Sequence, residues 1–469
     1  MTSTARPFRV LRSKPLWISN GVIVGVLAIL FAVFYVGANI DPPGHMHHLP
    51  VGLVNADKGA TVGGKEVDLG AQITGSIKKS KASGDKIEWK VMDEKEVKKE
   101  LGKGKLYGAL VVPRDFSASV AALTTTSHGT PVRPALTVLT NQSAGSLGSS
   151  LARQATTTAA QSASVSVGKD LTAQVEAAQA KAVKAAQVKA AKAAHAKGAK
   201  ASKAQGATSK AAAAQTRLPT AARLLLADPA AVHIEDGHPL DSHSGLGLTA
   251  FYYSLVLVVC GMLSANVIGG QVDHALGYTH NDMGPLRKHN PLVRATRVQT
   301  LAISSTLMIG LSIVMASLVM AGAIGIMGMD ASHLPLLWLY SVTAIAVCGI
   351  GALSLIAVFG TPGMLLVTLF YIAMAVPTAG ATTPVQALPG FYRFLAEFEP
   401  LRQITGGVRS ILYYGAQGDA GLTRGWAMLG AGLLAAGLFG FGMTRLYDRK
   451  GLHRIPHEAG EPERAAVLA

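Results

Sequence analysis

Histidines and carboxylates gather at both ends of a long polar stretch of this chain, and these residue types can bind a metal ion or a proton. His45, His47 and His48 follow the first apolar run, and a second group precedes the next run: His233, Glu235, Asp236, His238, Asp241 and His243. Imidazole and carboxylate groups are ligands for divalent metals. Their spacing matches no zinc pattern, so solvated linkers remain the alternative to a metal or pH-sensing site.

The glycine-rich segments do not predict a nucleotide site. No Walker A pattern occurs in the sequence, and "GKGK" at Gly102–Lys105 follows a predicted helix, where it is typical of a helix-ending loop. "GLGLTA" at Gly245–Ala250 opens an apolar run instead of a βαβ unit. No nucleophile–base arrangement supports an enzyme, so we assign no catalytic, cofactor-binding or metal-binding residue and expect no cofactor.

The composition predicts a membrane protein. Hydrophobic residues make up 49% of the 469 residues and charged residues 15%, whereas a soluble domain carries about 25% charged residues. Six apolar runs have the length of a membrane-spanning helix: Trp17–Ala38, Gly247–Gly269, Leu301–Gly325, Leu336–Val358, Pro362–Gly380 and Trp426–Leu446. None contains Asp or Glu, and the only Lys or Arg among them is Arg445, the second-last residue of the sixth run. Proton- or ion-coupled carriers usually need a carboxylate or a histidine within the membrane. If the chain is a transporter, the energy for transport would therefore come from a partner.

Basic residues in the short flanks predict the orientation. Clusters lie before the first run (Arg6–Lys14), between the second and third (Arg287–Arg297) and at the end of the sixth and beyond it (Arg445–Arg454). The positive-inside rule then places both termini in the cytoplasm and makes the chain a multi-pass protein of the plasma membrane. The predicted order is a cytoplasmic segment (1–16), a first membrane helix (17–38), an extracytoplasmic domain (39–246), a permease-like domain with five more membrane helices (247–446) and a cytoplasmic tail (447–469).

The first part of the extracytoplasmic domain, residues 49–141, alternates between strand and helix patterns. Short apolar runs bounded by turn residues predict strands at 49–55, 87–93, 106–113 and 134–141. Helices are expected at 70–80, 94–101 and 115–123. This alternation is typical of a small α/β module.

The second part, residues 142–230, is an Ala/Lys-rich helical region. Its stretch 171–216 is dominated by Ala and Lys, which are strong helix formers. We expect a long solvated helix or helical hairpin, broken near Gly198 and Gly206, that forms a basic stalk or else docks on an anionic envelope surface. No stacking aromatics are interleaved, so we expect no nucleic-acid partner.

Two features predict helix packing within the membrane. Gly21 and Gly25 form a G-x-x-x-G pattern that allows close approach of another helix, either within the chain or in a dimer. The segment Leu388–Gly415 carries Phe391, Phe394, Leu395 and Phe398 on one helical face, and Pro400 and Gly406-Gly407 are expected to break it. Two short helices that lie in the interface or re-enter the bilayer are expected. Asn266 is the most conspicuous polar residue in a predicted span, with an interhelical hydrogen bond as its plainest role.

Two stretches carry a resemblance to a known family. "LPVGLVNADKGATVGGKEVDLG" (Leu49–Gly70) with "GKGKLYGALVVPRDFSASV" (Gly102–Val120), and "FEPLRQITGGVRSILYYG" (Phe398–Gly415), look like the YhgE/Pip (phage infection protein) family and its relatives with the DUF3533 domain. These proteins resemble membrane components of type-2 ABC transporter permeases. The Ala/Lys-rich segment departs from that pattern, and no catalytic residue transfers.

The resemblance implies the export of an amphipathic or lipid-like compound by a homodimeric permease-like unit in contact with membrane lipids, with an ATPase on a separate chain. The alternative is a non-transporting envelope protein, either a surface receptor or an accessory of a secretion apparatus. A co-purifying ATPase would distinguish the two.

Overall fold

The computed structural model describes residues 14–39, 41–62, 65–79, 84–125, 133–196, 227–240, 243–279, 281–283, 286–288, 290–452 and 454. These residues form two compact units. One comprises residues 47–142 and 148–239, and the other comprises residues 1–46, 143–147 and 240–469. Each unit has its own hydrophobic core.

A five-stranded mixed sheet forms the centre of the first unit. The strand order is β4-β1-β5-β6-β7, with β5 and β6 antiparallel and the other pairs parallel. The strands are β1 (Leu49–Asn55), β4 (Ile87–Val91), β5 (Gly108–Val112), β6 (Ala135–Thr140) and β7 (Ala231–Asp236). A separate hairpin joins β2 (Ala60–Val62) to β3 (Lys65–Val67). The two central strands β1 and β5 are buried along nearly their whole length, which explains their continuous apolar sequences.

The four predicted strands and three predicted helices of residues 49–141 are confirmed. The helices are α3 (Leu69–Lys79), α4 (Glu94–Leu101) and α5 (Phe116–Thr125). Asp93 begins α4 by accepting a hydrogen bond from the backbone N–H of Glu96, and Gly102 ends it. The loop Gly102–Lys105 is therefore a helix ending, as its sequence predicts.

The fifth strand, β7, lies beyond the predicted boundary of the module. It pairs with β6 from Ala135↔Ala231 to Thr140↔Asp236. In β7, Val232 packs against the core, but four of the six residues are exposed, because it is the edge strand of the sheet. The α/β module thus takes its last strand from a segment that we interpreted as a linker.

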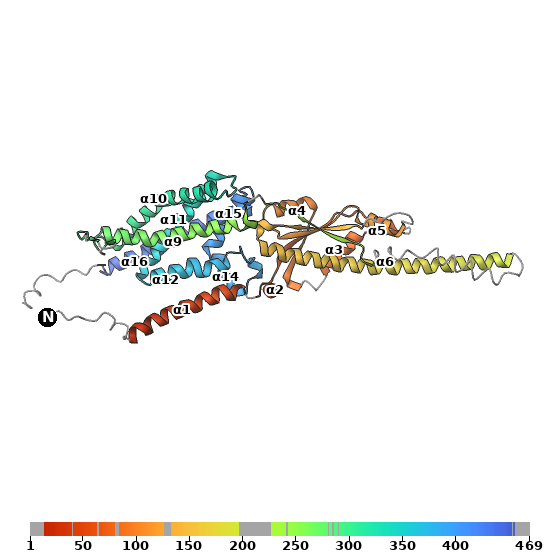
Figure 1. The fold of residues 1–469 in the computed structure, drawn as a ribbon, viewed down its shortest axis with the longest axis horizontal. Helices are drawn as coiled ribbons and strands as arrows, with labels where there is room; N and C mark the ends of the chain where they lie inside the picture. Colours follow the sequence, from red (N-terminus) through yellow and green to blue (C-terminus); the bar gives the residue numbers. More distant parts are fainter. Residues whose placement is uncertain are drawn as a thin grey trace, which may run out of the picture. The chain divides into compact units, whose positions relative to one another are not determined.

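The helix α6 lies within the predicted helical region 142–230. It runs from Ser146 to Ala196, 51 residues, and so begins well before the Ala/Lys-rich stretch. Its first half packs on the sheet through small and apolar residues at helical spacing: Leu151, Ala152, Ala160, Ala163, Val167 and Leu171. Figure 1 shows α6 running along the sheet and continuing past it as a single rod. Gly198 and Gly206, the predicted breaks, lie outside the described residues.

Four apolar helices of the second unit are long enough to cross a membrane: Thr249–Ala275, Arg297–Ile326, Leu334–Phe359 and Leu422–Arg449. They correspond to α9 (Thr249–Ala275), α10 (Arg297–Met320) with the π-helical η5 (Ala321–Ile326), α11 (Leu334–Phe359) and α16 (Leu422–Arg449). They match the second, third, fourth and sixth predicted spans as apolar helices of sufficient length. Tyr253, Leu257, Met308, Tyr340 and Cys348 lie in their shared core.

The remaining two predicted spans are not confirmed as spans. α1 (Lys14–Asn39) has 26 residues, but the side chains of several of them lie outside the described part. The fifth predicted span is divided into α12 (Gly363–Thr368), the π-helical η6 (Leu369–Met374) and α13 (Ala375–Thr378), and the run Gly363–Thr378 is short for a membrane-spanning helix.

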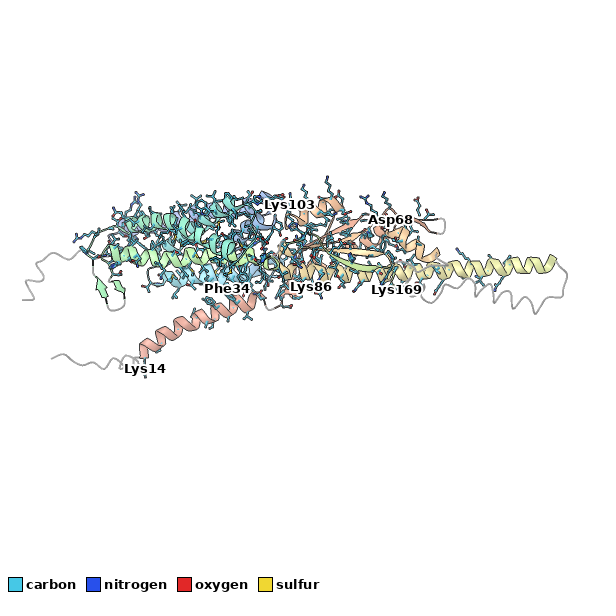
Figure 2. The ribbon with its side chains drawn as sticks, turned by 45° about the horizontal axis from the view of Figure 1, so that its top comes forward. Lys14, Phe34, Asp68, Lys86, Lys103 and Lys169 are labelled. Atoms are coloured by element: carbon cyan, nitrogen blue, oxygen red, sulfur yellow. The ribbon has the colours of Figure 1, made fainter. Side chains whose placement is uncertain are left out.

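Only one end of α1 packs on its own unit. Phe34, which is labelled in Figure 2, and Ala38 pack with Ala373 and Tyr392, whereas Lys14 lies at the opposite end of the helix. No atom lies within 4 Å of a Cβ built on Gly25. This part of the G-x-x-x-G pattern therefore has no helix partner within the described chain, while the surroundings of Gly21 are not described.

Short elements complete the second unit and the loop between α3 and β4. They are α2 (Pro42–His45), η2 (Gly84–Lys86), η3 (Gln142–Ala144), η4 (Gly245–Gly247), β8 (Asn281–Met283), β9 (Leu286–Lys288), η7 (Val385–Ala387), α14 (Gly390–Phe398), α15 (Pro400–Tyr413) and η8 (Gly418–Ala420). The pair α14 and α15 contains the candidate site.

Candidate functional site

The cluster of histidines and carboxylates that a metal or pH-sensing site would need does not form in the described residues. His47 and His48 precede β1 and their rings stack at 4.0 Å between centroids. The end of β7 and the start of β1 lie at the same end of the sheet. The two strands are three positions apart in the strand order, which corresponds to about 14 Å. Of the second group, His233 faces Glu235 at 3.2 Å on the exposed edge strand, and Asp241 lies outside the described residues.

No group of three or more possible metal ligands occurs in the part of the chain that the structure describes. His243 lies 4.0 Å from Asp330, a pair in the second unit. Residues 231–236 are therefore a strand instead of a solvated linker, and the histidines are dispersed. The segment Gly245–Ala250 likewise forms the turn η4 and the start of α9, as its position before an apolar run predicts.

Asp57 connects the segments of the α/β module that carry the family resemblance. It follows β1, and one carboxylate oxygen accepts the backbone N–H of Ser117 at 3.1 Å. The other oxygen accepts the N–H of Gly70 at 3.0 Å and the hydroxyl of Ser117. A Cβ on Gly70 would lie 2.5 Å from the Cβ of Asp57, so a larger residue does not fit there. Asp57 thus ties the starts of α3 and α5 to the end of β1.

The helix pair α14–α15 follows from the sequence around Pro400. Glu399 has an extended backbone (φ −73°, ψ 126°), as a residue before proline requires, and α14 ends there. Pro400 occupies the first turn of α15, and the Glu399 carboxylate accepts the backbone N–H of Arg402 at 3.0 Å. The predicted pair of short helices is therefore confirmed, with its hinge at Glu399–Pro400.

The two helices differ in how deeply they are buried. On α14, Tyr392 packs against Phe34 and donates to the carbonyl of Val33 at 2.7 Å, while Phe391, Phe394 and Phe398 are 60–63% exposed. The predicted phenylalanine face exists, but it points away from the chain's own core. On α15, by contrast, nine of fourteen residues are buried. α15 is an interior helix of the unit, packed against α9, α11 and α16.

Gly407 allows α15 to lie directly against α11. A Cβ at this position would lie 2.2 Å from the Oη atom of Tyr340, which is fully buried on α11. Gly425 of α16 approaches the same oxygen, with a built Cβ at 2.4 Å. The expectation that Gly406-Gly407 break the helix is wrong, because α15 runs through both residues. Because Gly407 has no side chain, the Tyr340 ring fits between α11, α15 and α16.

A charged network surrounds the hinge. Glu397 accepts hydrogen bonds from Arg402 at 3.0 Å and from Arg424 of α16 at 2.5 Å. Arg424 also donates to the side-chain oxygen of Gln403 at 2.9 Å. Burial alone would raise the pKa of Glu397, but the hydrogen bonds from the two arginines outweigh it and lower that pKa. Glu397 is therefore an ionised, paired carboxylate.

Glu399, two residues away, is in a different electrostatic state. It is 2% exposed, and its Oε1 atom has no hydrogen-bond partner among the described residues. Burial raises the pKa of Glu399 to about 8, against the lowering effect of the backbone N–H groups of Leu401 and Arg402 and of the Arg402 charge. At neutral pH this side chain is therefore mainly a neutral carboxylic acid, inside a bundle whose predicted spans contain no carboxylate.

An apolar cavity of about 410 Å³ adjoins the hinge. Its walls come from α11, η6, α15 and α16, and the hinge contributes the two neighbours of Glu399, Phe398 and Pro400. The other side chains that define it include Val347, Leu355, Phe370, Tyr371, Gln403, Met428 and Phe439. Gln403 links this cavity to the charged network. The arrangement is an apolar chamber with a polar group at its edge, which is typical of a site for a small ligand.

A second cavity, of about 330 Å³, lies between α9, α10 and α11 and has a more polar lining. Asn266 lines it and is exposed instead of bonded across a helix interface. Asp273 pairs with Arg454 there, at 2.6 Å between Oδ2 and Nη2, and Asp448 accepts the backbone N–H groups of Arg297 and Val298 that begin α10. The charged groups around this cavity are therefore already engaged, since the guanidinium of Arg297 donates to the carbonyl of Leu452 at 2.7 Å.

Comparison with known proteins decides the family. A model of the family described as "Protein of unknown function (DUF3533)" matches residues 20–431. The chain belongs to the DUF3533 family. This DUF3533 protein is also 28% identical over 116 residues to the "Uncharacterized protein YhgE" of Bacillus subtilis (strain 168). That match covers 24% of the DUF3533 chain and 14% of the relative, so the chain aligns with a small part of YhgE. No solved structure matches the DUF3533 protein.

Sequence reasoning missed Glu399 as a site residue of this DUF3533 protein. No predicted span contains an acidic residue, and Glu399 lies between spans, in a segment whose charged residues lower its mean hydropathy. One signal was available. A Glu-Pro pair after an amphipathic run places the carboxylate at a helix start, where it turns towards the backbone. Only the packing of α15 inside the bundle makes this carboxylate a buried one.

Proposed function

We propose that this DUF3533 protein is the membrane permease-like component of an exporter of an amphipathic or lipid-like compound. The observation that carries the proposal is the apolar cavity of about 410 Å³ beside the α14–α15 hinge. Its volume lies within the range of roughly 300–1,000 Å³ that small-molecule sites occupy. Aliphatic and aromatic walls suit an acyl or ring system.

The hinge supplies the polar end that an amphipathic compound needs. Gln403 lines the cavity and is hydrogen-bonded to Arg424, which in turn holds Glu397. A ligand head group placed at this network finds both donors and a carboxylate. The combination favours a compound with an apolar body and a polar end over a purely apolar one or a simple ion.

The proposed membrane arrangement has six spans, with α1 and the α12–α13 run added to the four long helices. Both termini are then cytoplasmic, the α/β unit is outside the plasma membrane, and lipids cover the exposed apolar side chains. α1 exposes Ile18, Val22 and Ile29 at 60–65%. Together with the phenylalanine face of α14, this surface offers an apolar seam for a second copy, so the proposed assembly is a homodimer.

The proposed energy source is an ATPase on a separate chain that binds the cytoplasmic loops. The hairpin β8–β9 carries Arg287 and Lys288 between α9 and α10. The Tyr278 hydroxyl stabilises that loop, because it donates a hydrogen bond to the carbonyl oxygen of Ala295 and accepts one from the N–H of the same residue. The other proposed contact, Arg6–Lys14, lies outside the described residues except for Lys14, which begins α1.

The experiment is a pull-down after mild detergent extraction. Replacing Arg287 and Lys288 together with Glu should abolish ATPase co-purification and leave membrane insertion intact. The matched control reverses the charge of Lys98 and Lys99, two exposed residues of α4 in the other unit, and should keep the ATPase. If the purified chain exports substrate in vesicles with a proton gradient alone, the separate ATPase is not needed.

One observation favours the alternative, an envelope protein that does not transport. The 51-residue helix α6 continues beyond the sheet with an Ala/Lys-rich surface, and a cavity-based exporter has no use for it. An extended basic arm suits an accessory of a secretion apparatus or a surface receptor. Pull-down of envelope components that depends on residues 172–196, with no ATPase present, would support this function in place of export.

A further inference from the structure

Glu399 is a buried carboxyl group whose surroundings leave it without a countercharge. The nearest cation is Arg402, and its guanidinium is held elsewhere: Nη1 donates to the carbonyl of Ala396 at 2.8 Å and to Glu397 at 3.0 Å. Arg402 bonds the Glu399 side chain through its backbone N–H, which donates to Oε2. A buried ionised carboxylate needs more compensation than this.

The other groups that interact electrostatically with Glu399 do not supply the missing charge. They are the thiol of Cys348 on α11 and the phenol of Tyr371 on η6. Both are neutral at physiological pH, and if ionised they would be negative and would repel a carboxylate. Burial thus favours the protonated form of Glu399, and two backbone N–H groups and the partly engaged Arg402 oppose it only in part.

We propose that Glu399 is a proton-binding site, and that the bound proton holds the α14–α15 pair in its docked position beside the apolar cavity. Loss of the proton leaves a charge next to Phe398 and Pro400 in the cavity wall, where it has backbone N–H donors but no ion-pair partner among the described side chains. Hydration of that charge requires the hinge to move outward or water to enter. The proposal goes beyond the proposed function, since it holds whether or not the chain exports a compound.

The expected protonation behaviour follows from the raised pKa. With a pKa of about 8, about ten Glu399 side chains are protonated for each ionised one at pH 7. The folded-state pKa lies above the unfolded value of 4.5. Stability from this group is therefore complete below pH 4.5, falls as the pH rises, and is lost once the pH passes the folded pKa.

The first measurement is infrared difference spectroscopy of the full-length protein in lipid nanodiscs, which detects the carbonyl band of a protonated carboxyl group. We expect the band at pH 7 in the wild type and in Glu397→Gln, its loss in Glu399→Gln, and its titration near pH 8. Glu397→Gln is the matched control, because it removes a neighbouring carboxylate that is ionised. Absence of the band in the wild type at pH 7 overturns the proposal.

The second measurement is the thermal midpoint between pH 5 and pH 9. The wild type and Glu397→Gln should lose stability as the pH rises to about 8, and Glu399→Gln should have a smaller slope. An equal slope in Glu399→Gln shows that the pair is not held by this proton and refutes that part of the proposal. If Glu399→Gln does not accumulate, the infrared titration of the wild type with isotope-labelled glutamate still decides whether the proton is bound.

Discussion

Replacing Gly407 with alanine should loosen α15 from α11. The new Cβ would lie 2.2 Å from the Oη and 2.4 Å from the Cζ of Tyr340. That ring cannot withdraw without disturbing its neighbours, because it is fully buried and packs edge-on against Trp426 at 5.1 Å between centroids. Overpacking of this kind costs about 1–3 kcal/mol. Alanine recovers about 1 kcal/mol through its higher helix propensity.

The adjacent glycine provides the control. A Cβ on Gly406 meets no atom within 4 Å, so Gly406→Ala gains the same helix propensity without the clash. The two variants should therefore differ in stability by about 1–3 kcal/mol, the overpacking term alone. The assay is the thermal midpoint of the detergent-solubilised protein. Shortening the neighbour with Tyr340→Leu in the Gly407→Ala background should restore part of the loss, as coupled residues do. Equal midpoints for Gly407→Ala and Gly406→Ala would refute the close approach of α15 and α11.

Two further predictions concern the other unit and the orientation of the chain. Asp57→Ala should destabilise the α/β unit by about 1–3 kcal/mol, because the N–H groups of Gly70 and Ser117 lose their acceptor. The assay is limited proteolysis, and the control is Glu66→Ala, which changes an exposed residue of β3. The α/β unit should be cleaved faster in Asp57→Ala than in the control. A cysteine placed at Ser202 should react with a membrane-impermeant maleimide in intact cells and one at Ser3 should not, and the reverse result would invert the proposed topology.

The predictable part of the fold is the part where local pattern and burial coincide. β1 and β5 are short apolar runs between turn residues, and the four matched spans are long apolar runs, so their sequences report their environment directly. β7 gives a weak signal, because this edge strand is stabilised by backbone pairing and four of its six residues are exposed. The first half of α6 also gives a weak signal. It lies flat on the sheet, and its Ser, Thr and Ala residues allow this packing without forming a strong apolar stripe in the sequence.

The candidate site could be predicted only in outline. The helix pair and its hinge follow from Pro400 and the spacing of the phenylalanines. The buried face of each helix does not follow from the sequence, because α14 turns Tyr392 inward and leaves Phe394 62% exposed. The burial of Glu399 is a tertiary effect. It depends on glycines that let α15 enter between α11 and α16, and this packing is not encoded in hydropathy.

The length of α6 has a mechanical consequence. At 1.5 Å per residue, its 51 residues extend for about 76 Å. A rod of that length acts as a lever: a rotation of about 5° around its first turn moves its last turn sideways by about 7 Å. Side-chain rearrangements near Ser146 that are too small to alter the bundle would therefore be magnified at the far end to the scale of a broken or formed contact. A change of a few degrees in the axis of α6 near Ser146 therefore corresponds to a displacement of about 7 Å at its last turn.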